Sequence, residues 1–392
     1  MLLNVGVLGI GNQGNMVAAL ANTRQIPVLG LNTSERDIDA VKSTTSIDCL
    51  YIGDGAGAGK NRNNSKAQLK TYIQSFMQDE TFKKFIEPLD VIFVVSSTGG
   101  GTGSGVAPMM ADILRSRYKK GVSVGKKSDD KEDKSEKIVI LIGTLPTIGE
   151  SIGAQRNTVE YLVEATRLEI PYLLFDNGNS TKSSTDAVYE QINADIVEAI
   201  SIIRGDYSQL SQFGMIDTRD MKEIITQPGL IHINMIKGIY QEKIPSDGSI
   251  EDLLVANMKN NTMITPDRDK IVNTRAYIVN LSDDVKSYFN TALPKLTEMY
   301  GEATNGFEHY SVNEDDEKAN YVIVISSGLS LPENRLKTIQ HRIDAAEEAL
   351  SKKKESSILQ SLSEKVGVYS KPASNSEADN STFNLDDILS KY

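Results

Sequence analysis

The feature that most constrains this chain is the run GGGTGSG at Gly99–Gly105, here called the glycine loop. It follows an apolar stretch, LDVIFVV, which is typical of a strand buried on both faces of a parallel sheet. A helical pattern, VAPMMADILRSR, follows it directly. Because five glycines in seven positions cost conformational entropy on folding, a purely structural turn seldom uses them. Backbone N–H groups of such a turn can surround a di- or triphosphate. We therefore predict phosphate contacts from Gly99, Gly100, Gly101, Thr102, Gly103, Ser104 and Gly105.

Strand and helix patterns alternate through the first 200 residues or so. Short apolar runs at Leu2–Gly9, Ile26–Leu31, Lys137–Gly143 and Pro171–Phe175 are separated by segments with helical spacing. Such alternation predicts a doubly wound α/β domain with a mostly parallel sheet.

A second glycine motif, GIGNQG at Gly9–Gly14, also lies between a strand and a helix. It is a literal GxGxxG, and the same string would suit a Rossmann dehydrogenase. A dinucleotide site needs an acidic residue at the end of the second strand to bind the ribose. That strand ends in Asn32 and Thr33, with Glu35 just beyond. An NAD-dependent oxidoreductase is therefore disfavoured, but it stays open as an alternative.

Charge and composition exclude several classes of function. The formal net charge is -11 and the sequence pI is about 5.0, which argues against a general nucleic-acid-binding face. A single cysteine, Cys49, allows no disulfide within one chain, and with three histidines a zinc site is improbable. We find neither a signal peptide nor an apolar stretch of ~18 residues, and expect a cytoplasmic protein without a membrane span.

The glycine loop, placed after an apolar strand, resembles the corresponding loop of the tubulin/FtsZ superfamily. Other segments resemble further nucleotide loops of that superfamily, in the same chain order. The resemblance implies GTP or GDP as the ligand, with Mg²⁺. It implies contacts from Gly11, Asn12, Gln13 and Gly14 in the first loop, Asn32 and Thr33 in the second, and Gly55, Ala56 and Gly57 in the third, which faces the γ-phosphate.

The third loop, Gly53–Gly59, is followed by Lys60 but is not a Walker A loop. Asp54 stands where that motif has its first glycine, and Asn61 follows the lysine in place of Ser or Thr. We therefore place no lysine on the phosphates and expect Mg²⁺ and backbone amides to neutralise their charge. The metal ligands stay unassigned, because the phosphates and water should hold most of the ion, with Asn12 or Gln13 nearby.

Guanine and ribose contacts are implied by looser matches. Glu150, four residues after Pro146, resembles the ribose-binding glutamate of FtsZ, and Arg156 follows two residues later than the FtsZ arginine that contacts guanine. Asn177 occupies the guanine loop, with Asp176 as the alternative. Tyr189 and Asn193 share one helix face at i and i+4 and resemble the stacking aromatic and the base-binding asparagine. Without the resemblance, a half-buried tyrosine beside a surface asparagine explains the pair better than a guanine-binding role does.

A pair of carboxylates follows the long helix, in the segment Phe213–Asp220, here called the acidic loop. Asp217 and Asp220 resemble the Asp-x-x-Asp of the superfamily's catalytic loop, and Met215 replaces its leading asparagine. The resemblance implies that both act on the nucleotide of the neighbouring subunit by polarising the attacking water. An ordinary helix N-cap is the alternative, and both roles are compatible.

The resemblance implies a fold and a domain order. We expect a GTP-binding domain over residues 1–185, a long central helix over 186–210 and a smaller α+β domain over 211–330. A long C-terminal helix over 331–364 and a disordered tail over 365–392, with a short amphipathic end, complete the chain.

The implied function is that of a cytoskeletal GTPase that forms head-to-tail filaments and hydrolyses GTP at the contact between subunits. The acidic loop and the C-terminal helix look closest to the plasmid- and phage-partitioning TubZ branch. That branch implies DNA segregation in a bacterial or phage-infected cell, and a DNA-binding adaptor on the tail. The alternative is a tubulin-like adaptor that binds nucleotide without polymerising.

Overall fold

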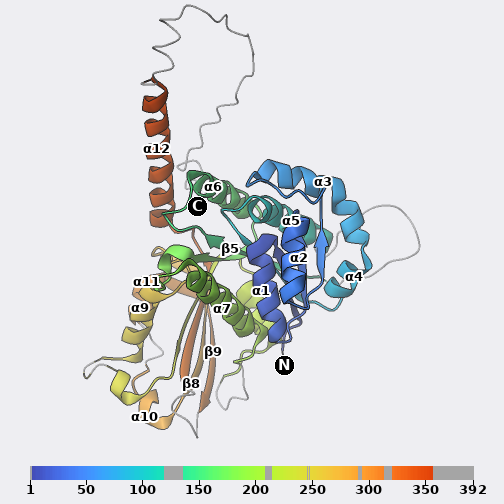
Figure 1. Ribbon diagram of the computed structural model, residues 1–392. Helices are drawn as coiled ribbons and strands as arrows, with labels where there is room; N and C mark the ends of the chain where they lie inside the picture. Colours follow the sequence, from blue (N-terminus) through green and yellow to red (C-terminus); the bar gives the residue numbers. More distant parts are fainter. Residues whose placement is uncertain are drawn as a thin grey trace, which may run out of the picture. The chain divides into compact units, whose positions relative to one another are not determined.

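One ten-stranded mixed sheet runs through the first part of the chain, in the order β3-β2-β1-β4-β5-β6-β7-β10-β8-β9 (Figure 1). The computed structural model describes residues 2–118, 136–207, 214–244, 246, 248–289, 294–312 and 320–355. The strands are β1 (Val5–Ile10), β2 (Val28–Asn32), β3 (Cys49–Tyr51), β4 (Val91–Ser97), β5 (Ile138–Leu145), β6 (Pro171–Asp176), β7 (Gly229–Lys237), β8 (Ile271–Leu281), β9 (Glu302–Val312) and β10 (Tyr321–Leu329).

The chain divides into two compact units, Met1–Pro332 and Glu333–Tyr392. Helix α12 (Glu333–Glu355) is the described part of the second unit. Residues 119–135 and the predicted tail over 365–392 lie outside the described residues. None of the helices described for this chain has both the length and the apolar character that a membrane span needs.

The first six strands confirm the predicted doubly wound domain. Every pairing among β1 to β6 is parallel, and β4 is buried over its apolar residues. The strand order reverses between β1 and β4, which pair from Val5↔Val91 to Ile10↔Ser96. Loops that leave the carboxyl ends of such neighbouring strands enclose a crevice in which α/β proteins bind ligands. The loop after β1 and the glycine loop after β4 therefore start side by side.

The helices of the first unit cover this sheet. Residues 67–85, which have the spacing of one helix, form parts of two, because Asp79 ends α3 and caps α4 by accepting the N–H groups of Thr81 and Phe82 at 2.8 and 3.3 Å. The helices are α1 (Gly11–Thr23), α2 (Glu35–Thr44), α3 (Arg62–Gln78), α4 (Glu80–Ile86), α5 (Thr102–Tyr118), α6 (Ile152–Arg167), α7 (Thr185–Arg204), α8 (Thr218–Ile225), α9 (Ile250–Asn260), α10 (Asp283–Lys286) and α11 (Pro294–Tyr300), with short 3-10 turns at η1 (Asn177–Asn179) and η2 (Gln241–Lys243).

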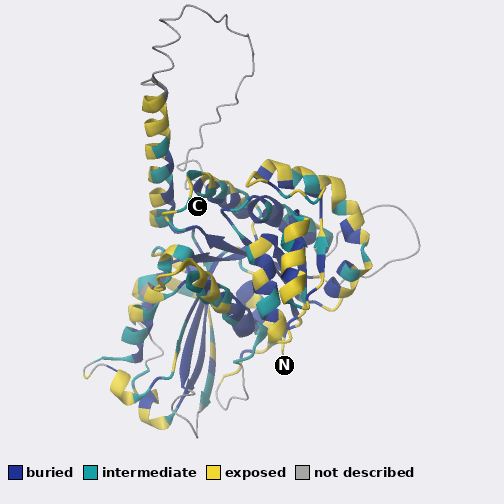
Figure 2. Cartoon of the chain, viewed as in Figure 1, coloured by how far each residue is buried: buried dark blue, intermediate teal, exposed yellow. Residues whose placement is uncertain are grey.

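Helix α7 is the long central helix expected over 186–210; its apolar residues follow helical spacing, and it ends at Arg204. Its buried side chains, including Ile192, Ile196 and Ile200, belong to a core that also holds residues of β1, β4 to β8 and β10, and Figure 2 shows these strands largely buried. The helix ends because Gly205 adopts φ +100° and donates its N–H to Ser201 O and Ile202 O.

Beyond α7 the sheet changes character. Strand β7 joins β6 in parallel through two residue pairs only, whereas β10 lies antiparallel to both β7 and β8. Strand β9 is parallel to β8 and forms the outer edge. This mixed half covers residues of the smaller α+β domain expected over 211–330, and it continues the same sheet. The domain bounds stay a prediction.

Glu198 on α7 ties the end of α1 and the end of β7 to the central helix. It accepts a hydrogen bond from Arg24 at 2.6 Å and others from Lys237 and Tyr207. Burial acts to raise the pKa of Glu198, but these hydrogen bonds outweigh burial and lower the pKa to about 2.

Replacing Glu198 with Gln should therefore lower stability at pH 7 by about 1 kcal/mol, because solvent screens this partly exposed cluster. The pKa of Glu198 in the folded protein lies below the ordinary value of 4.5, so its stabilisation is present above about pH 4.5 and disappears as the pH falls toward 2. Denaturant unfolding of wild type and Glu198→Gln at pH 7 and pH 3.5 tests this. A difference that does not shrink at the lower pH contradicts the assignment.

Candidate nucleotide-binding site

The first loop and the glycine loop touch through their backbones. Gly11, at φ +74°, begins α1, and a Cβ atom added to it would lie 3.2 Å from Gly103 N. A Cβ on Gly103 would lie 3.0 Å from the Cβ of Ser96 and 3.2 Å from the carbonyl oxygen of Ile10. Helices α1 and α5 both begin here. The free N–H groups and the dipoles at their amino ends therefore favour an anion at this point.

The glycine loop has one open position. A Cβ on Gly100 would meet nothing within 4 Å, whereas a Cβ on Gly101 would lie 2.7 Å from Lys60 Cα. A Cβ on Gly105 would lie 2.3 Å from Ser65 Oγ, and one on Gly99 3.1 Å from the Cβ of Ala154. The loop is therefore packed against α3 and α6 on one side and open at Gly100, as a phosphate cradle requires.

The second loop is bonded to the glycine loop. The hydroxyls of Thr33 and Thr102 lie 2.6 Å apart, and Asn32 Oδ1 accepts the N–H groups of Thr33 at 2.8 Å and Ser34 at 3.3 Å. The third loop follows, since Gly57 N donates to Thr33 O at 2.9 Å. Further contacts of the third loop are Glu35 N to Gly55 O at 3.1 Å and a β-bridge between Ser34 and Ala56.

The first loop also meets the central helix. Gln13 Nε2 donates to Asn193 Oδ1 at 3.2 Å, while Gln13 Oε1 is buried without a hydrogen-bond partner. Tyr189, 43% exposed, lies one turn earlier on α7. Its pKa is raised by burial and by the carboxylates of Glu150 and Asp186, which places Glu150 close to the tyrosine. Of the predicted base and ribose residues, Asn193 thus contacts the first loop, and Tyr189 lies one helical turn from Asn193.

Other predicted residues on the guanine side lie at the end of β6 and on α6. Asp176 is buried and its carboxylate accepts Gly178 N at 2.8 Å, so it caps the short turn η1. Asn177 is the first residue of that turn and half-buried. Arg156 lies exposed on α6, while Glu150 Oε1 accepts Thr147 N at 2.9 Å. The roles of Asn177, Arg156 and Glu150 toward a nucleotide stay predictions.

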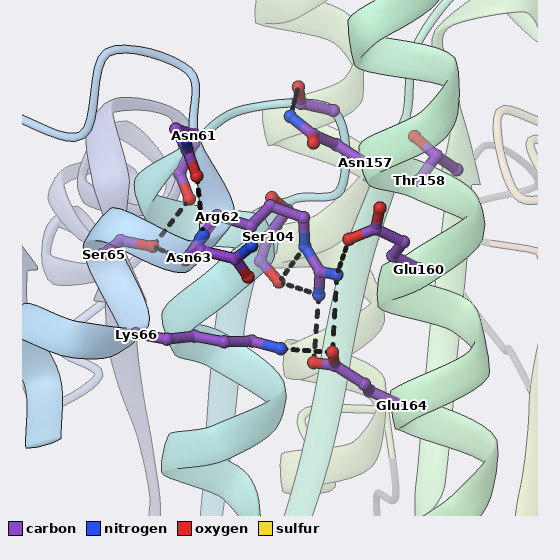
Figure 3. Close-up of polar contacts among 12 residues, drawn as sticks. Asn61, Arg62, Asn63, Ser65, Lys66, Ser104, Asn157, Thr158, Glu160 and Glu164 are labelled. Atoms are coloured by element: carbon purple, nitrogen blue, oxygen red, sulfur yellow. Dashed lines mark hydrogen bonds and ion pairs between the residues drawn. The ribbon is translucent and has the colours of Figure 1, made fainter. Parts of the chain in front are cut away.

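A buried arginine supports the glycine loop, and the sequence analysis missed it (Figure 3). The side chain of Arg62, 2% exposed, donates to Ser104 O from Nε at 3.2 Å and from Nη2 at 2.8 Å. Its guanidinium pairs with Glu160 at 2.7 Å and Glu164 at 2.9 Å. The four-residue spacing of these glutamates, which puts both on one face of α6, was the available signal.

Two uncharged side chains complete this support. Ser65 Oγ donates to Gly101 O at 2.9 Å. Asn157 Nδ2 lies 3.1 Å from both Gly99 O and Gly100 O and 3.2 Å from Lys60 O. Carbonyl groups of Gly99, Gly100 and Gly101 are thus bonded by side chains of α3 and α6. Gly99 N donates to Ser97 Oγ and Gly105 N to Gly101 O, which leaves the N–H groups between them for a ligand.

The acidic loop forms the N-cap that the sequence allows. Asp217 Oδ1 accepts the N–H groups of Arg219 at 2.7 Å and Asp220 at 2.9 Å, and Asp220 Oδ2 accepts Asp217 N at 3.1 Å. This reciprocal capping box begins α8. The backbone hydrogen bonds from Asp220 and Arg219 lower the pKa of Asp217, which is fully exposed and ionised at neutral pH.

The acidic loop lies toward the amino ends of the parallel strands, whereas the nucleotide loops lie at their carboxyl ends. Lys222 on α8 forms an ion pair with Asp90 at 2.8 Å, and Asp90 lies just before β4, whereas the glycine loop lies just after it. Nine residues of extended chain, from Asp90 to Gly99, span about 30 Å. Ile216 N also donates to His309 Nδ1 on the edge strand β9 at 3.4 Å. The carboxylate pair therefore lies far from the glycine loop of its own chain.

Sequence comparison identifies the family of the first part of the chain. Residues 4–182 match the family model described as "Tubulin/FtsZ family, GTPase domain". This segment is a tubulin/FtsZ-family GTPase domain. It holds the first, second, third and glycine loops, and the match favours guanine nucleotide over the dinucleotide that GIGNQG alone would allow.

Among curated relatives, "Tubulin-like protein CetZ" of Pyrococcus horikoshii is 26% identical over 201 residues, which are 50% of this chain and 51% of the relative. The chain thus matches about half the length of such a curated relative. Among solved structures, a GTPγS-form protofilament of TubZ from Bacillus thuringiensis serovar israelensis has a TM-score of 0.71 at 15% identity and covers 91% of this chain and 95% of that one. A GTPγS-bound protofilament of CetZ2 from Haloferax volcanii has a TM-score of 0.67 at 18% identity and covers 88% and 99%. These two structures show the tubulin/FtsZ-like fold and favour neither branch.

The donor set suits a nucleotide better than a metal held by protein alone. In the part of the chain that the structure describes, no group of three or more His, Cys, Asp or Glu side chains could hold an ion. Gln13 Oε1 and Asn32 Nδ2 are buried near the loops and make no hydrogen bond. Buried polar atoms without a partner are compatible with a polar ligand beside the loops, and a place for Mg²⁺ near Gln13 stays a prediction.

Substituting the two central glycines should separate ligand binding from folding. Gly100→Ala should leave the stability of the free protein within about 1 kcal/mol but weaken GTP binding at least about tenfold, because the methyl group occupies the open side. Gly101→Ala should instead lower stability by about 1–3 kcal/mol, since its Cβ would clash with the backbone at Lys60. Calorimetric titration with GTP and thermal unfolding of both variants measure this. Unchanged GTP affinity in Gly100→Ala would show that the open side is not the ligand side.

Proposed function

We propose that this chain binds GTP in the loops between β1 and β4 and hydrolyses it when a second copy docks its acidic loop against them. The observation that supports this most directly is the separation of the two halves. The phosphate cradle lies at the carboxyl ends of the parallel strands. Asp217 and Asp220 lie toward the amino ends, where Lys222 pairs with Asp90. One molecule alone cannot bring them together.

Head-to-tail stacking of identical copies joins these two ends and repeats without closing, so it produces a filament. The titles of the TubZ and CetZ2 structures describe protofilaments of those proteins, which supports the same arrangement here. Met215, beside the carboxylates, is 59% exposed, as a residue at a contact between copies would be in the free chain.

The chemistry of the proposed site follows from its charges. The N–H groups at the starts of α1 and α5 hold the phosphates, and the glycine loop is fixed beforehand by Arg62, Ser65 and Asn157. Mg²⁺, when bound, would neutralise phosphate charge. The incoming Asp217 is ionised at neutral pH and, with Asp220, orients a water molecule toward the γ-phosphate.

We further propose that the filament positions plasmid or phage DNA in the cytoplasm. The likeness to TubZ, which includes a Clostridium botulinum phage protein, supports this role, and CetZ relatives leave it less specific. Because the chain carries a net charge of -11, DNA would be reached through a basic adaptor, for which the tail over 365–392 is our proposed docking segment. Loss of the DNA that carries this coding sequence from dividing cells, measured with and without the protein, tests the role.

Hydrolysis per subunit should rise with protein concentration. A site shared between copies needs association, so turnover should be low for dilute monomers and increase steeply once filaments form. Phosphate release, measured alongside light scattering in GTP and in GDP, tests this. A rate per subunit that is independent of concentration contradicts the shared site, and nucleotide binding without any scattering supports the non-polymerising adaptor.

Replacing Asp217 with Asn should separate catalysis from helix capping. Asparagine caps helices about as well as aspartate but has no negative charge. We expect unchanged folding and GTP binding, hydrolysis lower by about 100-fold or more, and longer-lived filaments. Asp79→Asn is the matched control, because Asp79 is also an N-cap aspartate and belongs to α4. Normal turnover in Asp217→Asn would remove the acidic loop from the mechanism.

A further inference from the structure

Lys60 stands in an unusual backbone conformation where the third loop joins α3. Its φ is +60°, and the preceding Gly59 has a φ of +59°. Side chains other than Asn and Asp seldom occupy this left-handed region, and a glycine would fit it without strain. A lysine held in such a conformation points to a use for its side chain.

The main chain of Lys60 is fixed against the glycine loop. Asn157 Nδ2 lies 3.2 Å from Lys60 O and 3.1 Å from Gly99 O and Gly100 O, so one amide group holds both segments. Lys60 Cα is also the atom that a Cβ on Gly101 would meet at 2.7 Å. The side chain of Lys60, which is exposed, therefore starts beside Gly101, the residue that follows the open position at Gly100.

The neighbouring cations are already neutralised. Arg62 pairs with Glu160 and Glu164, and Lys66 pairs with Glu164. Within the described ranges, the structure records no carboxylate paired with the Lys60 ammonium. Asp54, the nearby carboxylate of the third loop, accepts Ala56 N at 3.1 Å and Gln68 Nε2 at 3.3 Å. Lys60 is thus the charge beside the glycine loop that remains available to an anion.

We propose that Lys60 binds the terminal phosphates of the nucleotide and supplies the positive charge that the glycine loop lacks. This inference rests on the proposed function, because it names a further contact of the same site. The sequence pattern placed no lysine on the phosphates, since Asp54 and Asn61 break the Walker A motif. Tertiary contact through Asn157 instead brings the main chain of Lys60 to the glycine loop.

Binding of GTP, GDP and GMP to the full-length protein tests the inference. Lys60→Asn removes the charge, and asparagine tolerates the left-handed backbone. We expect Lys60→Asn to bind GTP at least about tenfold more weakly than wild type, GDP more weakly by a smaller factor, and GMP equally well. Lys60→Arg should restore most of the GTP affinity, and the loss in Lys60→Asn should diminish at high salt.

Lys70→Gln is the matched control, since Lys70 is an exposed lysine on α3, which begins two residues after Lys60, and its replacement should leave binding unchanged. Thermal unfolding of the free variants checks that Lys60→Asn folds as wild type does. Wild-type affinity for GTP in folded Lys60→Asn overturns the inference while leaving the proposed function intact. If wild type itself binds no guanine nucleotide, the proposed function fails first.

Discussion

The close approach of the glycine loop to its neighbours is the constraint on which the rest of the site depends. Its backbone meets the first loop at Gly11 and the start of α3 at Lys60, at distances that leave no room for a Cβ at Gly101 or Gly103. These contacts aim N–H groups of several segments at one volume. A protein interior that is close-packed cannot rearrange there cheaply, so the cradle exists before any ligand arrives.

Arg62 contributes to that rigidity as a buried cation whose charge is compensated within the protein. Burying a guanidinium is unfavourable unless charges and hydrogen bonds compensate it. Here two glutamates of α6 supply the charge and Ser104 O accepts two N–H groups. The arrangement links α3, α5 and α6 behind the glycine loop. It also uses up the negative charge of Glu160 and Glu164 away from the side where phosphates would bind.

Sequence pattern predicted the parallel half of the sheet, the long α7 and the place of the glycine loop, because these follow from local spacing. Apolar spacing over 67–85 alone favours one helix, whereas the chain forms two, because Asp79 ends α3 and caps α4. It did not find Arg62 or Asn157, whose side-chain partners lie 42 residues or more away along the chain. The mixed pairing of β7, β10, β8 and β9 was likewise outside its reach, since strand order depends on long-range contacts.

By itself, the sequence determined the chemistry: glycines where phosphates need close backbone approach, hydroxyls and amides around them, and two aspartates that cap a helix. The tertiary structure decided the geometry. The reversal of strand order between β1 and β4 put the loops of the cradle together. The pairing of Lys222 with Asp90 put the aspartates toward the opposite ends of the strands. The physical reason is that residue types fix what a group can bind, whereas the direction of a strand fixes which end of the molecule presents it.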